Sequence, residues 1–172
     1  MNIRKLTELS MLTAVALIIF IIELRIPNLS AVSGVKLGLA NIITVYAVYH
    51  YKFGEVAMVV FARVLLGSVF GGNISAIIYS ACGATACLLG MSVLKRIIPE
   101  NYMWLCSVAG AVFHNIGQIM AAICVTRTFT VVSYLPVMIV CSCIAGFFTG
   151  MCTQFIFKRI LLSKQKSTDL YL

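Results

Sequence analysis

The chain has 172 residues, of which 62% are hydrophobic and 10% are charged, and its mean hydropathy is +1.05. Soluble domains carry about 25% charged residues, so this composition excludes an ordinary soluble enzyme and predicts an integral membrane protein with one compact domain. The formal net charge of +8 comes from 13 Lys and Arg residues against five Asp and Glu residues. In such an apolar chain this excess is expected from the positive-inside rule, and no mixture of basic and aromatic residues indicates a nucleic-acid surface.

Apolar segments recur along the chain, separated by proline, by glycine and asparagine, or by basic residues. They predict an all-α bundle of six transmembrane helices over residues 6–26, 37–51, 55–70, 74–93, 103–125 and 134–160. The second and third segments have about 15 residues each and barely cross a hydrocarbon core of about 30 Å. A five-span alternative would fuse these two short segments into one hairpin.

Basic residues predict the orientation of the bundle. With six spans, nine Lys and Arg residues share a side with both termini, namely Arg4, Lys5, Lys52, Lys95, Arg96, Lys158, Arg159, Lys164 and Lys166. Three lie on the other side, namely Arg25, Lys36 and Arg127. We therefore expect a multi-pass protein of the cell membrane with both termini in the cytoplasm. Residues 1–162 are expected to form the transmembrane domain and residues 163–172 a polar cytoplasmic tail that need not fold.

The fifth span carries a polar cluster near its middle, formed by His114, Asn115 and Gln118. Such groups are costly in hydrocarbon unless they face protein, water or a ligand. His114 and Gln118 are four residues apart and share one helical face, with Asn115 on the flank. The cluster either lines a binding cavity or forms hydrogen bonds between helices.

Further polar groups are expected at matching depth, in the half of the membrane away from the termini. They are Glu23 at the end of the first span, Lys36 and Asn41 at the start of the second, and Arg63 within the third. Arg63 is the costliest, at roughly 2.5–3.5 kcal/mol for a helix centre, so it should face Glu23, backbone carbonyls or an anionic ligand. We expect these residues and the fifth-span cluster to line one outward-facing cavity, with residues 27–35 as its lid.

Small residues four positions apart predict close helix packing. The pairs are Ser10 and Ala14, Gly34 and Gly38, Gly67 and Gly71, and Gly146 and Gly150. Such patterns let helix backbones approach one another inside a bundle. Ser10 and Ala14 lie near the cytoplasmic end of the first span and are equally suited to meeting a helix of a partner protein.

Residues that carry catalysis or hold metal are sparse. None of the seven cysteines forms a Cys-x-x-Cys pair or lies at zinc-site spacing, so no metal and no cofactor is expected. The chain has one aspartate, Asp169, and four scattered glutamates, whereas holding Mg²⁺ on a diphosphate takes paired carboxylates. A Walker A motif is also missing from the sequence. We therefore expect no enzyme activity from this chain alone.

Four blocks of sequence resemble, in order, a known membrane family. They are Lys36-Leu-Gly-Leu-Ala-Asn41, Arg63-Val-Leu-Leu-Gly-Ser68, Gly110-Ala-Val-Phe-His-Asn-Ile-Gly-Gln118 and Tyr134-Leu-Pro136. The family is that of Gx transporters, also called heptaprenyl diphosphate synthase component I, and the resemblance covers nearly the whole chain. It looks like a branch of the substrate-binding S components of energy-coupling factor (ECF) transporters. S components often carry an Ala-x-x-x-Ala docking pattern in their first helix, and Ser10 and Ala14 are the nearest match.

The resemblance implies a subunit of an ECF-type ABC importer. S components bind a scarce nutrient from outside and dock on a shared membrane scaffold with two ATPase subunits. The side chains suit a small, partly hydrophobic substrate with an anionic or carbonyl end, such as an isoprenoid or quinone precursor. The alternatives are a non-catalytic membrane component of a heptaprenyl diphosphate synthase, as the family's older name suggests, and a purely structural scaffold.

Overall fold

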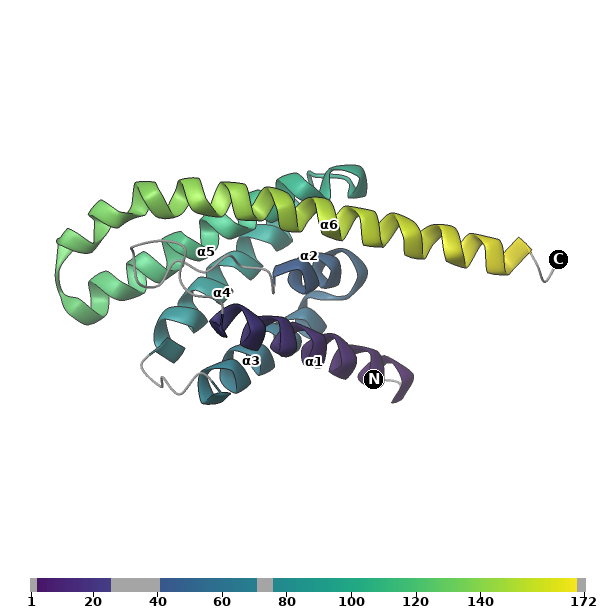
Figure 1. Ribbon diagram of the computed structural model, residues 1–172, viewed down its shortest axis with the longest axis horizontal. Helices are drawn as coiled ribbons and strands as arrows, with labels where there is room; N and C mark the ends of the chain where they lie inside the picture. Colours follow the sequence, from purple (N-terminus) through teal and green to yellow (C-terminus); the bar gives the residue numbers. More distant parts are fainter. Residues whose placement is uncertain (1–2, 26–40, 71–75, 170–172) are drawn as a thin grey trace.

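The structure is a computed structural model that describes residues 3–25, 41–70 and 76–169, with side chains over residues 3–22, 41–70 and 77–160. Every described element is helical, which confirms the predicted all-α class (Figure 1). The elements are α1 (Ile3–Arg25), α2 (Asn41–His50), α3 (Phe53–Phe70), α4 (Ala76–Leu94), η1 (Glu100–Tyr102), α5 (Met103–Thr126), η2 (Phe129–Tyr134) and α6 (Leu135–Asp169).

Five of these helices are long and apolar enough to cross a membrane, and α2 is the short sixth helix between them. The ten residues of α2 rise about 15 Å, half of a hydrocarbon core of about 30 Å. The expected start of this span, residues 37–40, lies outside the described residues. Six helices in this order are consistent with the predicted six-span bundle.

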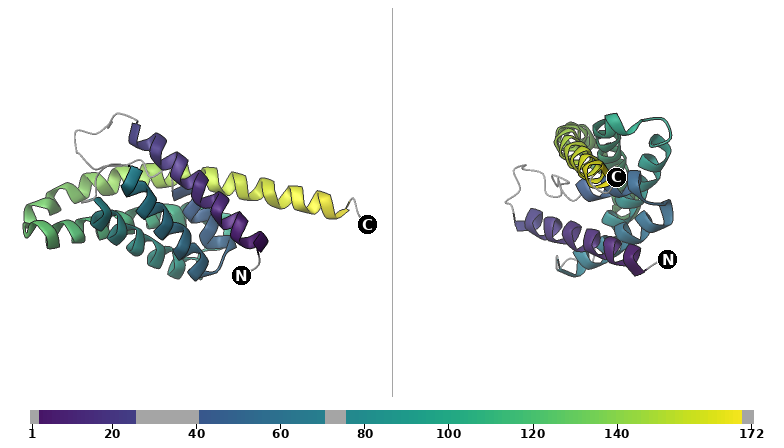
Figure 2. Two further views of the ribbon diagram at one scale, coloured as in Figure 1. Left: turned by 90° about the horizontal axis from the view of Figure 1, so that it is seen from below. Right: turned by 90° about the vertical axis from the view of Figure 1, so that its right-hand side faces the viewer.

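The end of the C-terminal helix differs from the expectation. The C-terminal helix α6 continues to Asp169 instead of ending near residue 160, and it projects past the rest of the bundle (Figures 1 and 2). Residues 161–169 contain neither glycine nor proline, so nothing local stops the helix. Helix α5 ends at Thr126, close to the expected position, and is capped by Arg127, whose φ of 52° is left-handed and whose N–H donates to the Ile123 carbonyl.

Contacts between helix ends show that successive helices alternate in direction. Lys5 near the start of α1 pairs with Glu55 near the start of α3, at 2.7 Å. The Lys95 ammonium donates to the carbonyl of Val48 in the last turn of α2. Gln154 of α6 donates to the Asn101 carbonyl just before α5. One end of the bundle therefore gathers these contacts together with most of the basic side chains, and we call it the basic end.

Helices α4, α5 and α6 pack closely because glycines replace side chains at their contacts. A β-carbon at Gly117 of α5 would lie 2.7 Å from the Cys82 carbonyl oxygen of α4. One at Gly146 of α6 would lie 2.9 Å from Val108 Cα of α5, and Gly150 is similarly close to α5. The Gly146 and Gly150 pair thus has the packing role that its spacing predicts.

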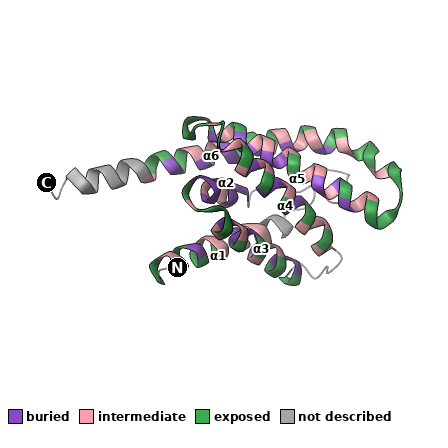
Figure 3. Cartoon of the chain, turned by 180° about the vertical axis from the view of Figure 1, so that it is seen from behind, coloured by how far each residue is buried: buried purple, intermediate pink, exposed green. Residues whose placement is uncertain are grey.

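The short helix α2 contributes the central part of the core, where Val45, Ala47 and Val48 are almost fully buried (Figure 3). Helix α1 lies on α3, with the Phe20 ring seated on Gly67. The expected partner of Gly67, Gly71, lies outside the described residues, as does the Gly34 and Gly38 pair.

Candidate functional site

Arg63, near the middle of α3, points into the bundle. The residue is 8% exposed, and its Nη1 atom donates to the hydroxyl of Thr44 on α2 at 3.2 Å. A buried guanidinium is costly without polar partners, and the Thr44 hydroxyl of α2 is one such partner at this depth. The charge is therefore held inside the bundle between α3 and α2 rather than facing lipid.

Asn41 lies one turn of α2 above this contact, toward the end opposite the basic end. It is 9% exposed and three residues before Thr44, which places both side chains on one face of α2. Among the described residues, no group forms a hydrogen bond with the Asn41 amide. Asn41 and Arg63 therefore border the same part of the interior.

His114 and Gln118 share one face of α5, as their spacing predicts, and that face lies against α4 at Gly83. A β-carbon at Gly83 would lie 2.7 Å from Gln118 Cγ and 3.0 Å from His114 Cε1. Both side chains are half-buried. His114 and Gln118 therefore meet α4 at Gly83.

Asn115 has a different environment on the flank of α5. Its Nδ2 atom donates to the Met138 carbonyl of α6 at 2.9 Å. This is the hydrogen bond between helices that the sequence left open as an alternative to a cavity lining. Asn115 therefore joins α5 to α6, while His114 and Gln118 meet α4.

Three parts of the predicted site lie outside the described side chains. They are Glu23, Lys36 and the proposed lid over residues 27–35. On α1, the predicted docking residues Ser10 and Ala14 are both exposed. They share their face of the helix with Met11 and Val15, which are 67% and 42% exposed.

Thr44 and the polar network of the basic end were not predicted from the sequence. Thr44 lies three residues after Asn41, so the helical period on the second span would have revealed it. At the basic end, the Tyr51 hydroxyl donates to Glu8 at 3.2 Å, and Glu8 pairs with Arg4 at 3.8 Å. These residues, with Lys5 and His50, surround a polar pocket of about 350 Å³.

The described carboxylates all lie at the basic end. Glu8 and Glu55 are in ion pairs there, and Glu100 begins η1, the turn that leads into α5. Within the described residues, no group of three or more His, Cys, Asp and Glu side chains is placed to hold a metal ion. The chemistry that these described interior groups offer is therefore hydrogen bonding and positive charge.

These features define a polytopic all-α membrane protein with a positive charge and amide groups inside its helix bundle. Residues 12–156 match the model of the family described as heptaprenyl diphosphate synthase component I, and the chain belongs to that family. This confirms the predicted resemblance to the heptaprenyl diphosphate synthase component I family, whereas the resemblance to ECF S components stays a prediction. No curated protein and no solved structure matches the chain.

Proposed function

We propose that this protein is the substrate-binding S component of an ECF-type importer. Its substrate is a small, partly hydrophobic molecule with an anionic end, of the isoprenoid or quinone-precursor class. The observation that carries the proposal is the buried guanidinium of Arg63 at the centre of the membrane bundle. An ionisable residue inside a membrane-spanning helix is by default a candidate for a functional site, because its burial is costly.

The arrangement around Arg63 suits an anionic oxygen. A guanidinium offers five N–H donors in a planar fork. The hydrogen bond from Arg63 on α3 to the Thr44 hydroxyl on α2 fixes the orientation of this fork. Asn41 adds an amide one turn nearer the end of the bundle away from the basic cluster. His114 and Gln118 border the same region across α4, and Glu23 and Lys36 complete the proposed set. Groups held on helices in this way are pre-organised for binding.

Energy for import comes from partners in this proposal. The sequence has no Walker A motif, so ATP hydrolysis belongs to two separate ATPase subunits bound to a membrane scaffold protein. The exposed face of α1 around Ser10 and Ala14 is the surface proposed to dock on that scaffold. With the basic end in the cytoplasm, the polar interior opens outward.

The test uses Arg63→Gln, with Arg127→Gln as a matched control at an exposed arginine. Native mass spectrometry of the purified protein identifies the molecule that co-purifies, and its affinity is then measured for each variant. A lost charge-assisted hydrogen bond is worth about 1.5–3 kcal/mol, so affinity should fall at least about tenfold in Arg63→Gln. If Arg63→Gln instead melts at a lower temperature and keeps full affinity, the arginine is structural and the proposal fails.

A second candidate function rests on the description of the family itself. It is a non-catalytic membrane component of a heptaprenyl diphosphate synthase. The two functions require different partners, so the tagged protein is captured from its native membranes and the complex is assayed for two activities. ATP hydrolysis without prenyl chain elongation supports the importer. Prenyl chain elongation without ATP hydrolysis supports the synthase.

A further inference from the structure

The last turn of α2 is tied to the end of α4 by two hydrogen bonds at the basic end. The Lys95 ammonium donates to the Val48 carbonyl, and the Tyr49 hydroxyl donates to the Ile98 carbonyl at 3.2 Å. Tyr49 is 9% exposed and Lys95 is half-buried, whereas the neighbouring Arg96 is exposed. Lys95 therefore differs from the basic residues that only face solvent at this end.

The spacing of residues on α4 brings Lys95 to the interior. Its N–H donates to the Met91 carbonyl at 2.8 Å, so Lys95 continues the helical hydrogen bonds of α4. It lies four residues after Met91 and seven after Leu88, so the three side chains share one face of the helix. Met91 and Leu88 are 0% and 6% exposed. The Lys95 side chain therefore starts from the buried face of α4 and reaches α2 from there.

The Val48 carbonyl needs a donor from outside its own helix. In a longer helix it would accept a hydrogen bond from the N–H of Lys52. That N–H donates instead to the Glu55 carboxylate at the start of α3, at 3.0 Å. Val48 is 3% exposed, so little solvent reaches it. Lys95 thus satisfies a carbonyl that the turn between α2 and α3 leaves open, and its charge also suits the negative end of the helix dipole.

The contact with Arg63 lies one turn away on the same short helix. Thr44 is four residues before Val48, and its hydrogen bond from Arg63, at 3.2 Å, is at the long end of the usual range. A shift of α2 away from α3 by a few tenths of an ångström therefore weakens this bond. Apolar packing is not directional, so the buried side chains of α2 do not fix its position along its own axis as closely as hydrogen bonds do. The position of Thr44 therefore depends on how the last turn of α2 is held.

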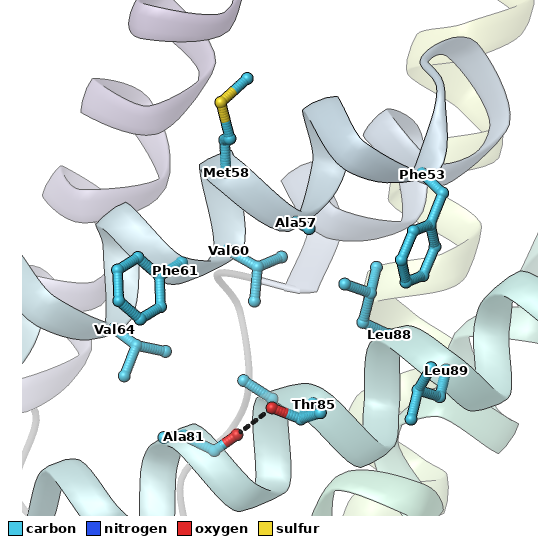
Figure 4. Close-up of a pocket in the computed structure, with 11 residues that line it drawn as sticks. Phe53, Ala57, Met58, Val60, Phe61, Val64, Ala81, Thr85, Leu88 and Leu89 are labelled. Carbon is cyan, nitrogen blue, oxygen red and sulfur yellow. Dashed lines mark hydrogen bonds between the residues drawn. The ribbon is translucent and has the colours of Figure 1, made fainter.

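Direct contact between α3 and α4 does not supply this positioning. A pocket of about 490 Å³ lies between the two helices, and its lining is apolar apart from Thr85 (Figure 4). The Thr85 hydroxyl donates to the Ala81 carbonyl of its own helix at 2.7 Å, so it does not join α4 to α3. The hydrogen bonds of Arg63, Lys95 and Tyr49 instead connect α3 to α4 through α2.

We propose that Lys95 and Tyr49 are positioning residues for the interior charge. By holding the last turn of α2 on α4, they keep Thr44 at the place where it orients the guanidinium of Arg63. The inference rests on the proposed function for its meaning in substrate binding, because Arg63 is the residue assigned there to the anionic end. The order of the Arg63 side chain can be measured without any substrate, so the two proposals fail separately.

The experiment measures hydrogen exchange of the Arg63 guanidinium protons by NMR of the isotope-labelled full chain in detergent micelles, with no substrate added. The Arg63 signals are assigned by their loss in Arg63→Gln. Lys95→Met and Tyr49→Phe should each speed this exchange about tenfold. Thr44→Val, which removes the acceptor itself, should speed it at least as much.

Matched variants separate the two contacts from general effects of charge or size. Arg96→Met removes an exposed cation next to Lys95, and Tyr102→Phe removes the hydroxyl of a tyrosine that is 53% exposed. Both should leave the exchange of the Arg63 protons unchanged. Lys95→Arg keeps a cation with N–H donors and should also keep the natural rate.

The backbone amide of Ala111, at the contact between α5 and α6, serves as a reference for opening of the whole bundle. If Lys95→Met speeds exchange at Ala111 and at Arg63 by the same factor, or lowers the melting temperature with the Arg63 rate unchanged, Lys95 only stabilises the fold and the proposal is wrong. An unchanged Arg63 rate in Thr44→Val would overturn it as well. None of these results touches the affinity test of Arg63→Gln, which decides the proposed function. Should Lys95→Met fail to fold, Tyr49→Phe removes a single hydroxyl and gives the same test.

Discussion

Gly150 of α6 lies where the contact with α5 leaves no room for a side chain. A β-carbon there would lie 2.5 Å from Trp104 Cα and 2.7 Å from Ser107 Cβ. The backbone of α5 fixes the positions of both atoms, so no side-chain rotation can move either of them away. Gly150→Ala therefore has to push the two helices apart, and it separates Ser107 from Thr149, whose hydroxyls are 3.1 Å apart.

Opposing terms set the size of this effect. Alanine in a helix interior is favoured over glycine by about 0.5–1 kcal/mol. Overpacking a well-packed contact costs about 1–3 kcal/mol, and a lost hydrogen bond between membrane helices costs about 0.6 kcal/mol. With two contacts well under 3.0 Å, the overpacking term lies in the upper part of its range. We therefore expect Gly150→Ala to lower the free energy of unfolding by about 2 kcal/mol.

The matched control is Gly54→Ala, since no atom lies within 4 Å of a β-carbon at Gly54. That variant should be neutral or slightly more stable than the natural protein. Gly110→Ala should fall between the two, because the nearest atom is the terminal methyl carbon of Met91, which can move. Thermal and denaturant unfolding in detergent micelles measure all three. Equal stability of Gly150→Ala and Gly54→Ala would show that α5 and α6 are not in close contact at this point.

Three further predictions concern a helix end, a hydrogen bond and the topology. Arg127→Gly should raise the free energy of unfolding by about 1 kcal/mol, since φ at this position is left-handed; a loss of stability in thermal unfolding would contradict this. A double-mutant cycle of Ser107→Ala and Thr149→Val should give a coupling of about 0.6 kcal/mol, and zero coupling would mean that their bond contributes nothing. With the native cysteines removed, Ser167→Cys in intact cells should resist an impermeant thiol reagent that labels Arg127→Cys. Labelling at Ser167 would refute the six-span orientation.

The helices were predictable because residues close to each helix end determine where the helix begins and ends. Helix α5 begins at Met103, as expected, and ends at Thr126, one residue later than expected. Helix α4 ends at Leu94, immediately before the basic pair Lys95 and Arg96. The end of α6 was missed for the same reason, since the polar composition of residues 163–169 indicates solvent exposure but contains no residue that stops a helix.

The site was only partly predictable. The spacing of residues shows which side chains share one face of a helix, but it does not show which other helix packs against that face. The spacing of His114 and Gln118 predicted that they share one face of α5. It could not predict that this face would contact Gly83 of α4. Asn115 was recognised as polar and out of place, yet its bond to Met138 depends on how α6 returns along α5. Thr44 was missed because a threonine in an apolar span satisfies its hydroxyl within its own helix in many cases.

The position of α3 links the interior charge to the surface of the protein. This helix carries Arg63 at its middle, Glu55 at the basic end and Gly67 beyond the middle, and the latter two hold α1 through Lys5 and Phe20. On its other side α3 packs against α4 less closely than α4 packs against α5, where glycines bring the two helices together. A ligand that pulls on Arg63 therefore meets less resistance in moving α3 with α1 than in moving α4. In the proposed function, the exposed face of α1 is therefore the surface on which the scaffold would sense an occupied interior site.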